Sequence, residues 1–194
     1  MQEIRALLEL LTMLVTDPRT GVLIALLTVA AVNDYRSYRI PNWLTFGGAA
    51  FGLLYTAMVP FAPGEGLLWS LYGLLLGFAI SLPLYVLRAM GAGDVKLIAM
   101  AGAFLGPVDT VYAVLCTFMV GGVAALGFAL SKRAAGRMLK NIADSLQLML
   151  VSIAGRMTPS AHIDASVSVG RIPYGVSISI GTIGFVVAKQ LGYL

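Results

Sequence analysis

The chain has 194 residues, of which 59% are hydrophobic and only 11% are charged. A soluble domain carries about 25% charged residues, so the composition excludes an ordinary cytosolic enzyme and a disordered chain. Because the apolar stretches are not interrupted like the alternating strands of a membrane β-barrel, the sequence predicts an all-α polytopic membrane protein.

The apolar stretches predict about six transmembrane helices, together with amphipathic helices at the membrane surface. Residues 1–18 contain an apolar stretch too short to cross a hydrocarbon core of about 30 Å, so we expect this N-terminal segment to lie at the interface. The expected membrane segments follow at about 20–32, 43–59, 67–87, 95–105, 110–130 and 174–191. The fourth would be marginal alone, so we expect other helices to surround it.

Residues 131–173 separate the last two membrane segments and are more polar. They begin with lysines and arginines, continue with apolar residues at helical spacing, and end in a polar stretch. This order predicts a cytoplasmic basic loop, an amphipathic surface helix and a polar loop. We expect the whole chain, 1–194, to form a single membrane-embedded domain.

Most lysines and arginines fall in the connections after the first, third and fifth membrane segments, whereas the connection at 60–66 has none. The positive-inside rule places the basic connections in the cytoplasm. The net charge of +4 therefore indicates membrane orientation and lipid contact, and not a nucleic-acid partner. Asp109 falls on the opposite side of the membrane, where we expect it to be solvated.

The single cysteine, Cys116, and the single histidine, His162, limit the metal chemistry of the chain. One cysteine cannot build a cysteine-based zinc site, and one histidine cannot form the His-x-x-x-His pair of zinc-dependent proteases. We therefore expect no metal and no cofactor.

Asp34 and Asp94 are acidic residues at predicted membrane boundaries, both on the cytoplasmic side. Asp34 opens the stretch Asp-Tyr-Arg-Ser-Tyr-Arg-Ile-Pro-Asn, which contains Arg36, Pro41 and Asn42. Proline lacks an amide hydrogen and restricts the residue before it, so one helix should stop here and another should begin.

The stretch Gly-Ala-Gly-Asp-Val-Lys surrounds the second aspartate and contains Gly91, Gly93 and Lys96. Its glycines permit a tight turn and a close approach to another chain, with Asp94 at a helix N-terminus. Such a turn could hold an extended peptide beside a carboxylate, which is the geometry that a protease needs.

These charged residues also have structural explanations. The aspartates could cap helices or pair with Arg36 and Lys96, and Arg36 could be a cytoplasmic anchor. Lys96 is two residues from Asp94 and does not share its helix face. Membrane snorkelling or a substrate contact therefore remains open for Lys96.

Together these stretches resemble the type IV prepilin peptidases, the Gly-x-Gly-Asp aspartic proteases of membranes. A third matching stretch, Ile-Pro-Tyr-Gly at 172–175, could simply start a helix but borders the active site in that family. The resemblance covers roughly residues 20–191 and implies that Asp34 and Asp94 are the catalytic pair. The motif residues that it implies for substrate positioning are Gly91, Gly93, Arg36, Lys96, Pro41, Asn42, Pro173 and Tyr174.

The resemblance also implies a substrate and a location. The substrate is a prepilin with a basic leader and a hydrophobic helix, cleaved at the cytoplasmic face of the bacterial inner membrane. Bifunctional members carry an insert with paired Cys-x-x-Cys motifs and methylate the new pilin N-terminus. This chain has one cysteine and no such insert, so it resembles the short branch that serves Flp-like pili, without methyltransferase activity.

Two carboxylates a few ångströms apart cannot both ionise cheaply, so they share one proton. The ionised partner can take a proton from an attacking water, and the protonated partner can donate to the scissile carbonyl oxygen. The sequence leaves open which aspartate has which role. The main alternative is a proton-coupled small membrane transporter or channel that uses the boundary aspartates, and a third is a structural subunit of a secretion system.

Overall fold

The computed structural model describes residues 18–59, 64, 66–87, 89–131 and 173–193. The regular elements in these residues are all helices: α2 (Pro18–Ser37), α3 (Asn42–Met58), α4 (Leu67–Val86), α5 (Ala92–Ser131) and α7 (Tyr174–Gln190). The all-α class is thereby confirmed. The interfacial helix expected before residue 18 and the loop and surface helix expected at 132–172 lie outside the described residues.

Helices occupy all six predicted positions, because α5 contains two of them. Gly106 has non-helical backbone angles, φ 73° and ψ 179°, and Pro107 follows it. A positive φ favours glycine, and a Cβ added here would lie 2.0 Å from the ring of Trp69. α5 is therefore two helical segments joined at a kink, which matches the two predicted segments at 95–105 and 110–130.

α2 extends three residues beyond Asp34 to Ser37, so Asp34 lies in its last turn and is not its final residue. The helix ends at Ser37, and Tyr38 after it has a left-handed backbone with φ 51°. The Tyr38 N–H donates to the Asp34 carbonyl at 2.8 Å, which satisfies a terminal carbonyl of the helix. Pro41 then leads into α3, which confirms the predicted stop and start.

Two stretches of the described residues are long and apolar enough to cross a membrane, Leu67–Val86 and Ala92–Gly127. α3 and α7 have 17 residues each, which is at the lower limit of about 17–25 residues for a membrane span. A total of six membrane crossings therefore remains a prediction.

The helices belong to two compact units. The larger contains residues up to Gly121 and from Pro173 onward, and the smaller is Gly122–Ile172, of which the end of α5 is described. The centre of the larger unit is the first segment of α5, where Leu97, Met100 and Phe104 are almost fully buried. The prediction that other helices surround this short segment is confirmed.

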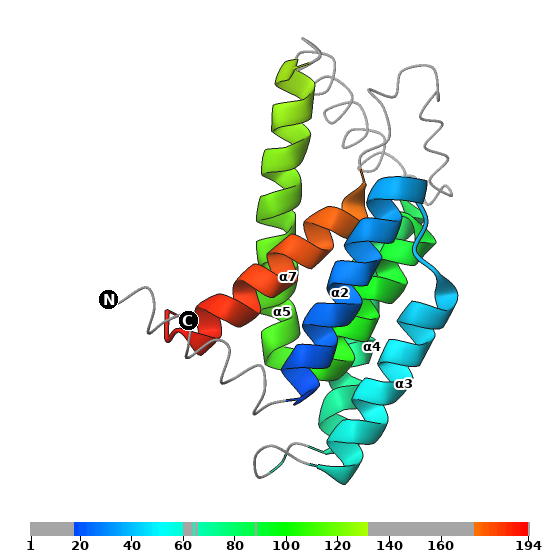
Figure 1. Cartoon of the computed structure of the whole chain (residues 1–194), viewed down its shortest axis with the longest axis vertical. Helices are drawn as coiled ribbons and strands as arrows, with labels where there is room; N and C mark the ends of the chain where they lie inside the picture. The colour runs from blue at the N-terminus through cyan, green and yellow to red at the C-terminus, as the bar shows by residue number, and fades with distance from the viewer. Residues whose placement is uncertain (1–17, 60–63, 65, 88, 132–172, 194) are drawn as a thin grey trace, which may run out of the picture. The chain divides into compact units, whose positions relative to one another are not determined.

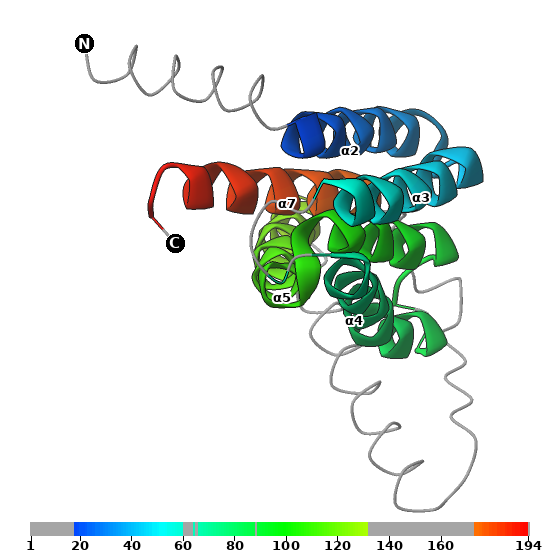
Figure 2. The same cartoon turned by 90° about the horizontal axis from the view of Figure 1, so that it is seen from below.

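This central segment lies between α3 and α4 (Figure 2), and close glycine contacts join it to both helices. A Cβ added to Gly73 of α4 would lie 2.1 Å from the carbonyl oxygen of Gly102 in α5, so the two backbones touch. On α3, Gly48 faces Met100 and Gly52 faces Phe104. Small residues that let helix backbones approach are typical of packing in lipid.

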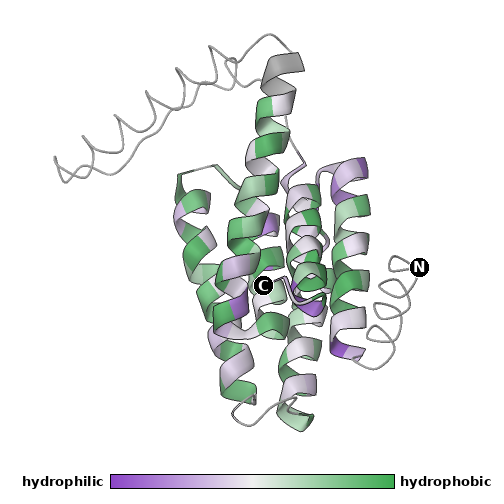
Figure 3. Ribbon diagram, turned by 90° about the vertical axis from the view of Figure 1, so that its left-hand side faces the viewer, coloured by the Kyte–Doolittle hydropathy of each residue, from purple (hydrophilic) through white to green (hydrophobic). Residues whose placement is uncertain are grey.

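The surface of the helices is apolar, whereas several buried side chains are polar. Figure 3 shows hydrophobic residues along much of each helix, and Trp43, Leu54 and Met58 are each more than 60% exposed. Inside, the Ser179 hydroxyl donates to the carbonyl of Leu27 at 2.8 Å and joins α7 to α2. This distribution suits a lipid environment, in which apolar surface needs no covering.

Candidate active site

Asp34 and Asp94 come together at one end of the larger unit, although they lie on different helices. Asp34 is in the last turn of α2 and Asp94 is in the first turn of α5. Both side chains are buried, at 6% and 8% exposure. Asp34 acts on Asp94 as a nearby like charge. The fold therefore places two buried carboxylates within electrostatic reach of each other.

The start of α7 orients the Asp34 carboxylate. α2 ends and α7 begins side by side near the top of Figure 1, and the Gly175 N–H donates to Asp34 Oδ2 at 2.7 Å. The next amide, the Val176 N–H, donates to the Pro173 carbonyl at 3.2 Å and also lies near this carboxylate. Because the first amides of a helix have no partner within the helix, α7 offers them to Asp34. A Cβ on Gly175 would lie 2.8 Å from Asp34 Oδ2, so the site fits only glycine.

The turn before α5 orients the Asp94 carboxylate in a similar way. The Gly91 N–H donates to Asp94 Oδ2 at 3.0 Å. A Cβ added to Gly93 would lie 3.3 Å from the Cβ of Ile40, in the connection between α2 and α3. These glycines form the turn before α5, and the close approach is to the stretch of the same chain that follows Asp34. The approach to a second chain stays a prediction.

Lys96 joins the same two stretches through its side chain. Its Nζ donates to Asn42 Oδ1 at 2.9 Å and lies 5.0 Å from the centroid of the Phe46 ring. Asn42 is the first residue of α3, directly after Pro41. Two of the predicted motif residues, Lys96 and Asn42, are therefore joined by a side-chain hydrogen bond between the start of α5 and the start of α3.

Of the other predicted residues, Tyr174 and Pro173 are at the site and Arg36 is not joined to it. Tyr174 is half-buried and close enough to interact electrostatically with Asp94, and Pro173 precedes the first turn of α7. Arg36 is exposed, and in the described part of the chain no ion pair joins it to Asp34. Its position fits a cytoplasmic anchor.

The capping explanation accounts for part of this geometry. Both carboxylates accept a backbone N–H beside the start of a helix, and such bonds stabilise helix N-termini. Capping does not explain why the two acids are buried near each other, because burial of a carboxylate is costly and a second negative charge adds repulsion.

Three residues contribute to the site that were not among the predicted site residues: Gly175, Ile40 and Phe46. Gly175 and Ile40 belong to the recognised sequence stretches, so their place in a motif was the available signal. Phe46 follows Asn42 by four residues on α3, and this spacing puts both on one helix face. Its role depends on Lys96, which is far away in the sequence.

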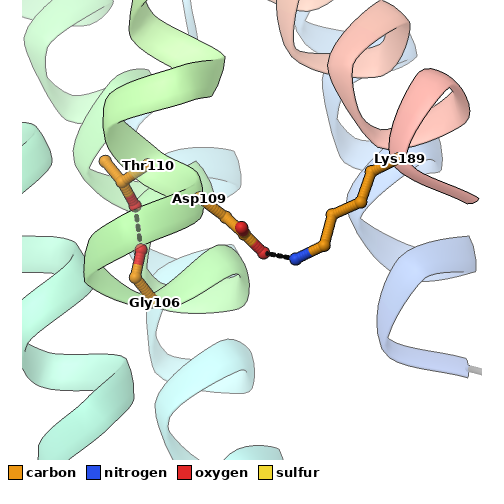
Figure 4. A network of polar contacts seen from close by, with 4 residues as sticks. All are labelled: Gly106, Asp109, Thr110 and Lys189. Atoms are coloured by element: carbon orange, nitrogen blue, oxygen red, sulfur yellow. Dashed lines mark hydrogen bonds and ion pairs between the residues drawn. The ribbon is translucent and has the colours of Figure 1, made fainter. Parts of the chain in front are cut away.

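A different acidic residue, on α5, lies beside the far end of α7. Asp109, at the start of the second segment of α5, forms an ion pair with Lys189 of α7 (Figure 4). The Asp109 side chain is 22% exposed, so it is partly solvated and also paired. The pairing arises because α7 runs back past α5 and brings a lysine to Asp109, which the sequence spacing does not show.

Metal ligands are not grouped in the residues that the structure describes: no set of three or more His, Cys, Asp or Glu side chains there could hold an ion. The site instead offers two carboxylates that can hold and exchange a proton, next to a phenol and backbone amides. His162 lies outside the described residues.

Comparison with known proteins assigns the chain to a family. A model of the type IV leader peptidase family matches residues 21–126. This match covers more than half of the chain and includes both aspartates, so the chain belongs to the type IV leader peptidase family. Neither a curated protein nor a solved structure matches it. Family membership makes the chain a peptidase and, with its two apolar helices, a membrane protein; it gives no support to a transporter or channel.

Proposed function

We propose that this protein is a membrane aspartic endopeptidase with Asp34 and Asp94 as its catalytic pair. The observation that carries the proposal is the burial of two mutually interacting carboxylates where α2, α5 and α7 meet. An ionised carboxylate that is buried without a positive partner costs free energy. An aspartic peptidase needs two such carboxyl groups close together, which gives a reason for keeping them buried. Family membership supports the same assignment.

The chemistry follows from the shared proton. One carboxylate is ionised and takes a proton from water as the water attacks the scissile carbonyl carbon. The other carboxyl is protonated and donates to the carbonyl oxygen, which gives a tetrahedral intermediate. When the C–N bond breaks, the first carboxyl gives the departing amine the proton that it took from water, and the second takes its proton back from the hydroxyl that becomes the carbonyl of the new carboxyl group. The amide donors from Gly175 and Gly91 hold one oxygen of each carboxylate, which leaves the second oxygen of each for this exchange.

The substrate in this proposal is a type IV, Flp-like prepilin, whose basic leader is removed at the cytoplasmic face of the bacterial inner membrane. A hydrophobic helix in the substrate suits an enzyme with an apolar outer surface, and the end of the protein that holds the aspartates is on the side with most lysines and arginines. The chain has one cysteine, so it cannot build the paired Cys-x-x-Cys insert of the methylating members. The released pilin N-terminus therefore stays unmethylated.

The test uses the purified protein in lipid vesicles and a synthetic prepilin with a basic leader and a hydrophobic segment. Asp34→Asn and Asp94→Asn should each lower kcat by about 10²–10⁴-fold or more, because each removes a group that exchanges the proton. Mass spectrometry of the products measures cleavage and also shows whether a methyl group is added in the presence of a methyl donor.

Asp109→Asn is the matched control, because it makes the same change to another acid of α5 that lies away from the site. This variant should cleave at the wild-type rate. The proposal is wrong if Asp34→Asn or Asp94→Asn remains folded and keeps more than about a tenth of the wild-type kcat.

A further inference from the structure

The contact between Lys96 and α3 has a geometry that bears on Asp94. Successive residues of an α-helix are about 100° apart, so the side chains of Asp94 and Lys96 leave α5 on nearly opposite sides. Asp94 is buried toward Asp34, and Lys96 is held by Asn42 and Phe46 of α3. A constraint on Lys96 is therefore a constraint on the rotation of the first turn of α5, and hence on the direction of Asp94.

A second contact lies next to the first. Gly93 packs against Ile40 so closely that a Cβ there would be 3.3 Å from the Ile40 side chain. The α2–α3 connection touches the start of α5 at Ile40, and the first turns of α3 touch it at Asn42 and Phe46. The contact between Gly93 and Ile40 fixes how closely the start of α5 approaches the α2–α3 connection. The bond between Lys96 and Asn42 fixes the rotation of the first turn of α5 about the helix axis.

We propose that Lys96 and Asn42 are positioning residues, which form a clasp that sets the Asp94 carboxyl against Asp34. The proposal rests on the proposed function of the aspartates, but it assigns Lys96 neither to snorkelling nor to substrate binding. The Lys96–Asn42 bond is exposed to solvent, so it adds little to the stability of the fold. It can still matter for the reaction, because a displacement of about 1 Å in reacting groups can cost about 10²-fold in rate.

The first arm of the test measures kinetics with the synthetic prepilin in vesicles. Lys96→Met and Asn42→Ala should each lower kcat by about ten- to a hundredfold, while KM changes by less than about threefold and Tm by a few degrees at most. The double variant should be no slower than the slower single variant, since both changes remove one interaction. Lys96→Arg keeps a donor to Asn42 and should recover part of the rate.

Lys189→Met is the matched control in this arm. It removes the other lysine contact between two helices, the ion pair with Asp109, at a place away from the aspartates. This variant should keep the wild-type kcat and KM, so a general effect of losing an interhelical lysine would be visible.

The second arm measures geometry without cleavage. Spin labels are attached at Tyr35→Cys and Ala92→Cys in a Cys116→Ser background, because both positions are exposed and flank the aspartates. Lys96→Met and Asn42→Ala should each widen or shift the distance distribution between the labels, and Lys189→Met should not. This arm remains informative if the unsubstituted protein does not cleave prepilin, in which case the proposed function fails and the clasp is judged separately.

Two results would overturn the clasp. A rise in KM for Lys96→Met, with no effect of Asn42→Ala and unchanged label distances, would make Lys96 a substrate contact. A fall in kcat with unchanged label distances for both variants would mean that the pair does not act through the position of Asp94.

Discussion

At the scale of single residues, the site depends on how each carboxylate is held. Asp34 and Asp94 each accept a backbone N–H from a glycine, and the two glycines come from different parts of the chain. The glycine of the Gly-x-Gly-Asp turn is close in sequence, so its use could be predicted. Gly175 is 141 residues away from Asp34, and only the packing of α7 beside α2 reveals its role.

Gly175→Ala should damage both catalysis and stability. The added methyl would overlap Asp34 Oδ2, which lies only 2.8 Å from the Cβ position, so the carboxylate or α7 must move. We expect kcat to fall by at least about tenfold and the free energy of unfolding to fall by about 1–3 kcal/mol. Prepilin cleavage and thermal unfolding in detergent measure the two effects.

Gly184→Ala is the control for this substitution, since it lies on the same helix and its Cβ would meet nothing within 4 Å. It should keep the wild-type kcat and, as alanine favours helix more than glycine does, it should not lower stability. Equal behaviour of the two alanine variants would show that space at Asp34 is not limiting.

At the scale of helices, backbone contacts at glycine position the site. The first segment of α5 carries Asp94 and lies against α4 through Gly73 and Gly102, whose backbones touch. After the kink at Gly106, the second segment of α5 packs against α7, where Gly181 lies against the backbone of Thr117. The Gly-Pro break was visible in the sequence, but the glycines that face other helices were not distinguishable from those that face outward.

Gly73→Ala should force α4 and α5 apart, because the new Cβ would lie 2.1 Å from a backbone oxygen that cannot rotate away. We expect a loss of several kcal/mol in the free energy of unfolding or a failure to fold, beyond the cost of about 1–3 kcal/mol of ordinary overpacking. Denaturation in mixed micelles measures the loss.

Gly47→Ala provides the comparison on α3, where nothing lies within 4 Å of the added Cβ. It should be neutral or slightly stabilising. If Gly73→Ala and Gly47→Ala unfold at the same denaturant concentration, the close crossing of α4 and α5 is wrong.

At the scale of the whole molecule, the charges are divided between two ends of the larger unit. The buried aspartates lie where α2 ends and α7 begins, and the Asp109–Lys189 ion pair lies near the end of α7 (Figure 4). Because both side chains of that pair are partly exposed, it adds little stability. The distribution of lysines and arginines predicts that the end with the aspartates faces the cytoplasm, and this orientation stays a prediction.

Single cysteines in a Cys116→Ser background test this orientation. A cysteine at Tyr35, beside the candidate site, should react with a membrane-impermeant maleimide only after the cells are permeabilised. A cysteine at Leu68, at the start of α4 and well exposed, should react in intact cells. The opposite labelling pattern would place the aspartates outside the cytoplasm and contradict cleavage on the cytoplasmic face.

The sequence by itself determined the helical class, the helix breaks at proline and glycine, and the two aspartates that stand out where charge is scarce. These properties are local or compositional: hydrophobic length, the missing amide of proline, and the cost of charge in lipid act on each stretch separately. Family membership rests on the same information, because its motifs are short stretches of the chain.

Only the tertiary structure decided which groups meet. The Gly175 amide on Asp34, the Lys96 contact with Asn42 and the pairing of Asp109 with Lys189 each join residues more than fifty positions apart. Such contacts depend on the direction and register in which helices pack, and in an apolar environment these are set by small residues at helix crossings. Composition and periodicity do not contain that information, since buried and lipid-facing positions are almost equally apolar.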